Sequence, residues 1–284
     1  MENKQGTRTS GETTTDLIAK TQMPQVLRDI ANDELTLYRK GRSVTVKNSI
    51  PDTADIPIQN RQHWLRIPDV VCVFVDMKGS TQLSASTKYD QRTVGAYQLF
   101  TEAAVRMFAE LDAPYIDVRG DGVFALFDQN QVYRAVAAAV SFKTYAATVF
   151  TPTIKKDMGF DIGAHIGIDQ KTVLVRKAGL KRRNGRTDRQ NEVWAGKPVN
   201  MAAKLAANGE ADSLLVSDRY YARITHDLVR RSCGCPDGSR TDLWTPVNAK
   251  DDPKFDFDTA YLLRSQWCAK HGAEYCEALL ALDS

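Results

Sequence analysis

The chain has 284 residues, enough for one large domain or for one domain with extensions. Its 38 basic and 35 acidic residues give a net charge of +3, which provides no general attraction to nucleic acid, although a basic run occupies residues 176–189. No stretch approaches 18 apolar residues and the first 16 residues are polar, so neither a membrane span nor a secretory signal is expected. We therefore expect a cytoplasmic protein with no nucleic-acid or membrane partner.

Residues 1–65 are predicted to form an N-terminal extension. Within it, residues 1–15 are polar and predicted to be disordered. Residues 23–38 repeat apolar side chains at helical spacing, which predicts a helix. Residues 50–58 contain two prolines and little periodicity, which is typical of a linker.

From residue 66 onward the pattern alternates between strands and helices. The expected elements are a buried strand at 70–75, a helix at 90–111, a hairpin of strands at 114–118 and 123–127, a helix at 131–150, and strands at 160–168 and 172–175. This order predicts an α+β fold with a ferredoxin-like βαββαβ core. A helix at about 199–207 and a short strand at 214–217 follow, and we assign residues 66–225 to the core domain.

The remaining residues, 226–284, form a C-terminal extension with a group of candidate zinc ligands. These are Cys233, Cys235, Cys268, His271 and Cys276. A disulfide framework is disfavoured in a cytoplasmic protein. Cys268 and His271 have the short spacing of a zinc half-site, and Cys233 with Cys235 could supply the other half. The alternative is a small subdomain with reduced thiols.

Two aspartates carry the strongest chemical signal. Asp76 follows the strand at 70–75, and Asp121 lies between two glycines in the hairpin. In this topology the first strand lies beside the hairpin, so the two carboxylates can converge and hold a pair of divalent cations, as chemistry on a nucleoside triphosphate requires. The alternative is two unrelated turn aspartates, since aspartate before glycine is common in turns.

Strand alternation predicts that Asp117, Arg119 and Asp121 share one face, whereas Val118 points into the core. Three charged residues on one face of a central hairpin indicate a functional surface rather than idle burial.

The turn after Asp76 runs from a strand into a helix start. Its residues Lys78, Gly79, Ser80 and Thr81 could cradle a triphosphate through their backbone N–H groups, although the spacing is not that of a Walker A loop.

Asn200 and Lys204 are four residues apart and therefore share a helix face, where an amide and an ammonium could hold ribose and phosphate. The alternative is an amphipathic helix with solvated polar residues.

These three segments together resemble a class III nucleotidyl cyclase homology domain over about residues 66–225. The segment 74–81 matches the first family motif in full, and Gly120-Asp121 matches the second. The third segment, 194–204, ends in Lys204 where the family usually has arginine.

The resemblance implies that Asp76 and Asp121, with the Met77 carbonyl, bind two Mn²⁺ or Mg²⁺ ions in each active site. It also implies that Asn200 orients the ribose and that Lys204 replaces the transition-state arginine. In this family the metal aspartates and the asparagine/arginine pair come from opposite chains, which implies a head-to-tail homodimer with two composite sites.

The base-recognition positions are atypical for this family. Adenylate cyclases usually present a lysine where this chain has Asp117, and an aspartate or threonine near Glu192. Guanine could donate two hydrogen bonds to either carboxylate, whereas uracil could donate one and accept from Arg119. The overall pattern is similar to bacterial anti-phage pyrimidine cyclases, which implies UTP as substrate, cyclic UMP as product and a separate effector protein activated by it.

The alternatives are a cytidylate, guanylate or adenylate cyclase in general signalling, and a catalytically degenerate nucleotide sensor with the same fold.

Overall fold

The computed structural model describes residues 23–85, 90–180 and 189–283. The predicted disorder of residues 1–15 and most of the basic run lie outside these ranges. No helix among the described residues combines the length and apolar composition that a bilayer span needs.

Within the described residues, nine strands form one mixed sheet in the order β3-β4-β2-β5-β7-β9-β8, with β1 paired to β2 and β6 paired to β5. The strands are β1 (Ser43–Val46), β2 (His63–Lys78), β3 (Tyr115–Arg119), β4 (Gly122–Phe127), β5 (Gly163–Leu180), β6 (Arg189–Gly196), β7 (Ser213–Ser217), β8 (Trp244–Asn248) and β9 (Thr259–Leu263).

The α-helices are α2 (Gln25–Arg39), α3 (Ser80–Ser84), α4 (Asp90–Glu110), α5 (Val132–Tyr145), α6 (Thr151–Met158), α7 (Lys197–Asn208), α8 (Asp218–Tyr221), α9 (Asp227–Arg230) and α10 (Gly272–Leu280). A π-helical turn, η3 (Ala146–Phe150), joins α5 to α6, and the short 3-10 helices are η1 (Thr53–Asp55) and η4 (Ala281–Asp283). The succession β2-α4-β3-β4-α5-β5 confirms the predicted βαββαβ order.

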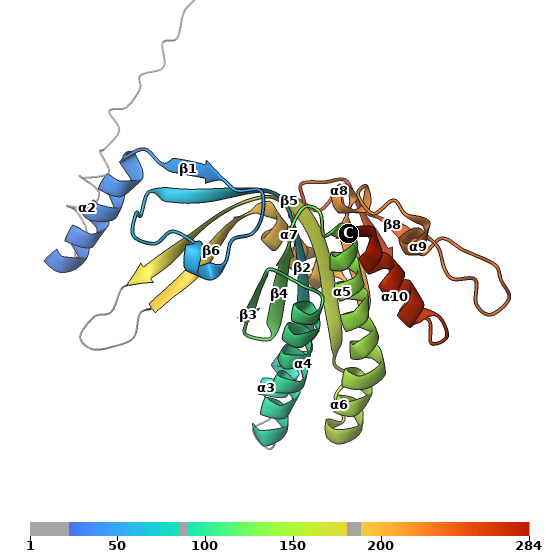
Figure 1. Ribbon diagram of the computed structural model, residues 1–284. Helices are drawn as coiled ribbons and strands as arrows, with labels where there is room; N and C mark the ends of the chain where they lie inside the picture. The colour runs from blue at the N-terminus through green and yellow to red at the C-terminus, as the bar shows by residue number, and fades with distance from the viewer. Residues whose placement is uncertain (1–22, 86–89, 181–188, 284) are drawn as a thin grey trace, which may run out of the picture.

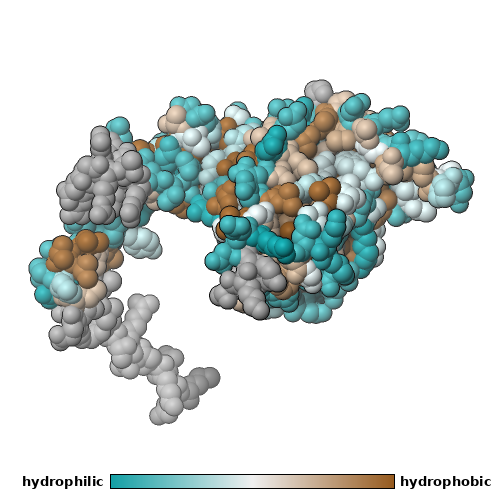
Figure 2. Space-filling model, turned by 90° about the horizontal axis from the view of Figure 1, so that it is seen from below, coloured by the Kyte–Doolittle hydropathy of each residue, from teal (hydrophilic) through white to brown (hydrophobic). Residues whose placement is uncertain are grey.

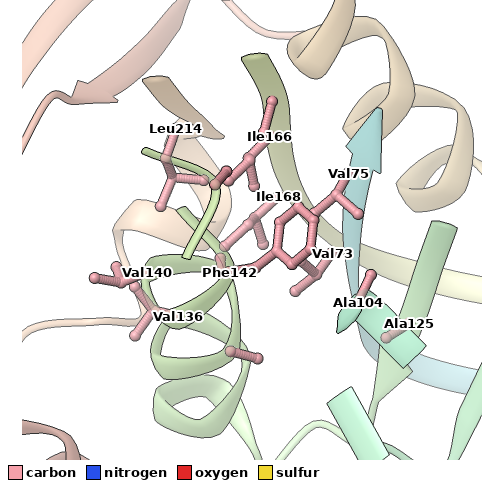
Figure 3. Close-up of a cluster of buried hydrophobic side chains, with 14 of the residues drawn as sticks. Val73, Val75, Ala104, Ala125, Val136, Val140, Phe142, Ile166, Ile168 and Leu214 are labelled. Atoms are coloured by element: carbon pink, nitrogen blue, oxygen red, sulfur yellow. The ribbon is translucent and has the colours of Figure 1, made fainter. Parts of the chain in front are cut away.

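The central sheet is packed on both faces. On one face lie α4 and the α5–α6 run (Figure 1), where Phe100 of α4 meets Phe142 of α5 edge-on with ring centroids 5.0 Å apart. Phe142 lies among aliphatic side chains of the sheet (Figure 3). On the other face, a second cluster includes Cys72, Phe124 and Ala202, the last contributed by α7.

Strand β5 is one long strand, although the sequence pattern predicted two. Asp169 and Gln170, which lie between the two predicted strands, pair with Cys72 and Val71 of β2. Because β2 also begins early, at His63, the two strands remain paired as far as Leu65 and Val175, with a bulge between Ile67 and Val70. Their distal halves, with β1 and β6, form an arm beside the central sheet (Figure 1).

The N-terminal extension packs against this arm in part. The segment 50–58, predicted to be a linker, buries Ile50 and Ile56, and the Ile50 amide donates a 2.7 Å hydrogen bond to Asp128. The predicted helix at 23–38 is present as α2, but its apolar residues Val26 and Ile30 are 62% and 53% exposed. Apolar surface on α2 is visible at the left of Figure 2.

Helix α7 approaches the sheet closely at Gly167 of β5. A Cβ atom at this position would lie 2.0 Å from the Ala202 carbonyl oxygen and 2.7 Å from the Ala206 nitrogen. Both are backbone atoms, so a larger residue can be accommodated only if the helix moves. Gly167 therefore sets the distance between α7 and the sheet.

We expect Gly167→Ala to displace α7 and to lower the free energy of unfolding by roughly 2–3 kcal/mol, as overpacking does in cores. The matched control is Gly95→Ala in α4, where a Cβ would have nothing within 4 Å, and where alanine should add about 0.5–1 kcal/mol through its helix propensity. Urea unfolding of both variants measures the difference, and equal stability of Gly167→Ala and wild type would contradict the close packing.

Candidate active site

The structure brings Asp76 and Asp121 together, as the sequence predicted. Asp76 lies near the end of β2, and Asp121 lies in the turn between β3 and β4, which pairs with β2. A Cβ on Gly122 would lie 2.9 Å from the Phe74 ring and 3.3 Å from an Asp76 carboxylate oxygen. A glycine at position 122 therefore lets the hairpin turn approach the Asp76 carboxylate.

The two carboxylates are half-buried and repel each other. Burial, and next the charge of Asp121, raise the pKa of Asp76 to about 6. A pair of carboxylates held in this way has an excess of negative charge that a divalent cation would neutralise. Hard oxygen donors of this kind suit Mg²⁺ or Mn²⁺, so the donor set fits such ions. Met77 follows with its side chain buried and its backbone paired to Ala164.

The turn that follows β2 has the predicted strand-to-helix geometry. Gly79 adopts φ +85°, a left-handed conformation that favours glycine, and α3 begins at Ser80. Lys78 is exposed at the end of β2. The binding of a triphosphate by residues 78–81 stays a prediction.

Strand β3 presents Tyr115 and Asp117 beside each other on one face. The Asp117 carboxylate pairs with the Arg119 guanidinium at 2.6 Å. The prediction that Val118 points into the core is wrong, since its side chain is 44% exposed. The physical reason is that β3 is the edge strand of the sheet and Val118 lies next to the turn.

Glu192 of β6 approaches the same face from the arm. The Tyr115 hydroxyl lies 3.5 Å from Glu192 Oε2, and the Tyr115 ring packs 4.7 Å from that of Trp194. Burial raises the pKa of Tyr115 to about 12, and the nearby Asp117 and Glu192 charges add to this. The two candidate base-recognition carboxylates therefore surround one buried tyrosine.

Lys177 completes this region and was not predicted. It lies opposite Glu192 in the β5–β6 ladder, with its ammonium 3.9 Å from the carboxylate. The length of β5 would have identified Lys177, but the sequence pattern predicted two shorter strands that both end before this residue.

Asn200 and Lys204 lie on α7 in different surroundings. Asn200 is exposed in the first turns of the helix, which begins with Lys197 and Pro198. The Lys204 ammonium donates a 2.9 Å hydrogen bond to the Lys254 carbonyl oxygen, so a loop of the C-terminal extension holds it. This partner lies 50 residues away, and no sequence pattern predicted it.

The loop between β8 and β9 is anchored along α7 by charges. Asp256 accepts from Lys197 at 2.5 Å and from Arg219 at 3.0 Å. Arg219 in turn holds the fully buried Asp169 through two hydrogen bonds of 2.7 and 2.6 Å. This bidentate pair compensates for the burial of a carboxylate inside β5.

The Asp256 carboxylate is strongly stabilised in its charged form. Burial by itself would raise its pKa, but hydrogen bonds from Lys197 and Arg219 outweigh burial and hold the pKa well below its usual range. The loop is therefore fastened most firmly when Asp256 is ionised.

We expect Asp256→Asn to lower the free energy of unfolding by about 1–2 kcal/mol at neutral pH, because charge-assisted hydrogen bonds are lost. Since the folded pKa is depressed, the difference from wild type should be full above a pH of about 4 and shrink as the pH falls further. Asp161→Asn is the control, because Asp161 is 80% exposed and its pair with Lys155 should contribute under about 1 kcal/mol. Denaturant unfolding from pH 7 to pH 3 measures both, and a pH-independent difference would contradict the ionised contact.

Most of the predicted zinc ligands also converge. Ligand atoms of Cys233, Cys235, Cys268 and His271 all lie within 4.8 Å of one another. The prediction that Cys276 belongs with these ligands is wrong, because Cys276 lies outside the group. Its position within α10 instead places it beside Ser141 of α5.

Comparison with known proteins adds direct relatives. No protein-family model matches the chain. A uridylate cyclase from Propioniciclava tarda is 36% identical over 232 residues, 80% of this chain and 73% of that protein. A uridylate cyclase from Micromonospora echinofusca is 32% identical over 268 residues, 93% of this chain and 86% of that protein. The chain belongs to the uridylate cyclase family.

Solved structures show that this uridylate cyclase family member has the fold of adenylyl and guanylyl cyclases. The adenylyl cyclase CyaB from P. aeruginosa matches with a TM-score of 0.56 and 16% identity, covering 72% of this chain and 96% of that one. The guanylyl cyclase Cya2 matches with a TM-score of 0.53 and 18% identity, covering 70% and 91%. The predicted class III cyclase fold is confirmed, and the protein is a nucleotidyl cyclase, a phosphorus–oxygen lyase.

Proposed function

We propose that this cyclase converts UTP to 3′,5′-cyclic UMP and pyrophosphate at a site built around Asp76 and Asp121. The observation that carries the site is the pair of half-buried carboxylates whose charges repel each other. In the reaction the ribose 3′ oxygen forms a bond to the α-phosphorus. The bond from the α-phosphorus to the bridging oxygen breaks, the 3′-hydroxyl proton is lost, and pyrophosphate leaves.

Asp76, Asp121 and the Met77 carbonyl would hold two Mn²⁺ or Mg²⁺ ions. When bound, these ions would acidify the 3′-hydroxyl and neutralise charge on the triphosphate. Backbone N–H groups of the turn at Lys78–Thr81 would bind the β- and γ-phosphates. Asn200 would orient the ribose.

Lys204 would place an ammonium near the α-phosphoryl group, where the family usually has arginine. Lysine supplies a point charge rather than a planar fork. Its contact with the Lys254 carbonyl orients the ammonium without neutralising it, since a carbonyl has no net charge. The β8–β9 loop would therefore position this residue.

The carboxylates around Tyr115 support a uracil substrate. Uracil N3–H can donate to a carboxylate of Asp117 or Glu192, and its two flanking carbonyls can accept from Arg119 and Lys177, which already pair with those carboxylates. Cytosine has an acceptor at N3, which a carboxylate would repel. The packed Tyr115–Trp194 rings favour the smaller pyrimidine over a purine, and the names of the two relatives agree with UTP.

Each of the four nucleoside triphosphates should be incubated with the purified protein and Mn²⁺. We expect cyclic UMP to form at least about 10-fold faster than any other cyclic nucleotide, the range that a few hydrogen bonds can discriminate. Glu192→Gln should reduce the preference for UTP over the other three triphosphates. Glu110→Gln should leave this preference unchanged, because Glu110 is exposed at the end of α4. Cyclic AMP or cyclic GMP as the main product would contradict the proposal for UTP, and no product from any substrate would contradict the catalytic assignment.

We further propose that the site is composite, with Asp76 and Asp121 from one protomer and Asn200 and Lys204 from a second copy in a head-to-tail homodimer. The exposure of Asn200 on α7 supports this arrangement, because the side chain is accessible to a partner.

Asp76→Ala, Asp121→Ala and Asn200→Ala should each reduce turnover at least about 100-fold and leave the dimer intact by size-exclusion chromatography. Asp242→Ala, which removes an 81% exposed carboxylate, should retain activity.

Equal amounts of the Asp121→Ala and Asn200→Ala proteins, mixed and allowed to exchange subunits, should recover about a quarter of wild-type activity, since half the dimers carry one intact site. No recovery despite proven exchange would refute the composite site, and full turnover in Asp76→Ala or Asp121→Ala would refute the metal assignment.

We also propose that the product serves as a second messenger in bacterial anti-phage defence and activates a separate effector protein in the cytoplasm. The motif resemblance to anti-phage pyrimidine cyclases supports this role.

A further inference from the structure

Three cysteines and a histidine meet in the C-terminal extension, on the far side of the fold from α2 (Figure 1). Cys233 and Cys235 follow α9, whereas Cys268 and His271 precede α10. Their ligand atoms lie within 4.8 Å of one another although the two segments are more than 30 residues apart in the chain. The cyclase mechanism uses none of these side chains.

The backbone of each segment is shaped to bring its side chains together. Gly234, between the first two cysteines, adopts φ +88°, and a Cβ there would lie 2.8 Å from the Gly238 carbonyl oxygen. Only glycine suits so tight a turn. In the second segment the Lys270 amide donates to Cys268 Sγ at 3.4 Å, and His271 Nδ1 lies 3.2 Å from Cys235 Sγ. An N–H group directed at sulfur favours the thiolate form that metals bind.

We propose that Cys233, Cys235, Cys268 and His271 bind a structural Zn²⁺ ion. Tetrahedral zinc with a Zn–S bond of about 2.3 Å separates neighbouring ligand atoms by about 3.8 Å. The group, spanning at most 4.8 Å, needs only a small contraction to reach that geometry. Three thiolates and one imidazole fill all four positions, so the site has no open position for substrate and its role is structural.

The site would join a loop to a segment that is already fixed on the core. Beyond β9, the Arg264 carbonyl accepts a 2.8 Å hydrogen bond from the buried Lys143 of α5, and Trp267 donates to Ser141 at 3.0 Å. At the end of the chain, Asp283 accepts from the amides of Tyr133 and Arg134 at the start of α5. Zinc would therefore fasten the 232–238 loop to α5 through this segment.

The same two segments line an apolar cavity against α5 and α10. Cys233 and Cys268 contribute to its wall, with Val136, Val140 and Leu279. Binding of both cysteines to one metal ion would hold this wall in place. A cluster of hydrogen-bonded thiols would hold it less firmly.

The test is metal analysis of the full chain, purified without chelator from zinc-supplemented cells. We expect about one zinc per chain in the wild type and less than about a tenth of that in Cys233→Ser and Cys268→Ser. Cys276→Ser is the matched control, because that thiol lies outside the group, and it should keep its zinc. Less than about a tenth of a zinc per wild-type chain, or an intact zinc content in Cys268→Ser, would overturn the proposal.

A second measurement avoids dependence on the folding of the variants. Wild-type protein stripped of zinc by a chelator should bind one Co²⁺ per chain with the visible absorption of tetrahedral thiolate coordination, and chelation should lower the thermal unfolding midpoint by at least about 5 °C. Cys276→Ser should behave identically. Octahedral-type absorption, or a disulfide among these cysteines by mass spectrometry of the alkylated native protein, would refute the site, whether or not the protein cyclises UTP.

Discussion

The antiparallel ladder between β2 and β5 positions every part of the candidate active site. Its register, from Leu65 opposite Val175 to Lys78 opposite Gly163, fixes where Asp76 lies at one end of β2. Strand β5 carries Gly167, which admits α7, and Asp169, which holds Arg219. A slip of one residue would exchange the two faces of the sheet and separate these groups.

The carboxylates on and near this ladder differ in the charge of their neighbours. Burial and the charge of Asp121 together raise the pKa of Asp76. Asp169 forms an ion pair with Arg219, and Asp256 forms ion pairs with lysines. The chain therefore supplies cations to Asp169 and Asp256, whereas the charged neighbour that raises the pKa of Asp76 is a second carboxylate.

The C-terminal extension contacts helices on both faces of the sheet that carries the candidate site. The β8–β9 loop holds α7 through Lys197, Lys204 and Asn208, with apolar support from Leu205 and Phe257. The segment beyond β9 is fixed on α5, which covers the opposite face of the same sheet. Both helical layers are therefore tied to residues after 240, so this extension is part of the packing around the candidate active site.

The sequence by itself determined the βαββαβ order, the strand-to-helix turn at Gly79 and the meeting of Asp76 with Asp121, because local periodicity and glycine positions specify these features. It also grouped four of the five candidate zinc ligands correctly. Only the tertiary structure decided that β5 is continuous, that Val118 is exposed and that Lys177 faces Glu192. It alone revealed that Lys204 and Asp256 are held across the α7 surface, since those contacts join residues 50 or more positions apart, and spacing along the chain carries no information about them.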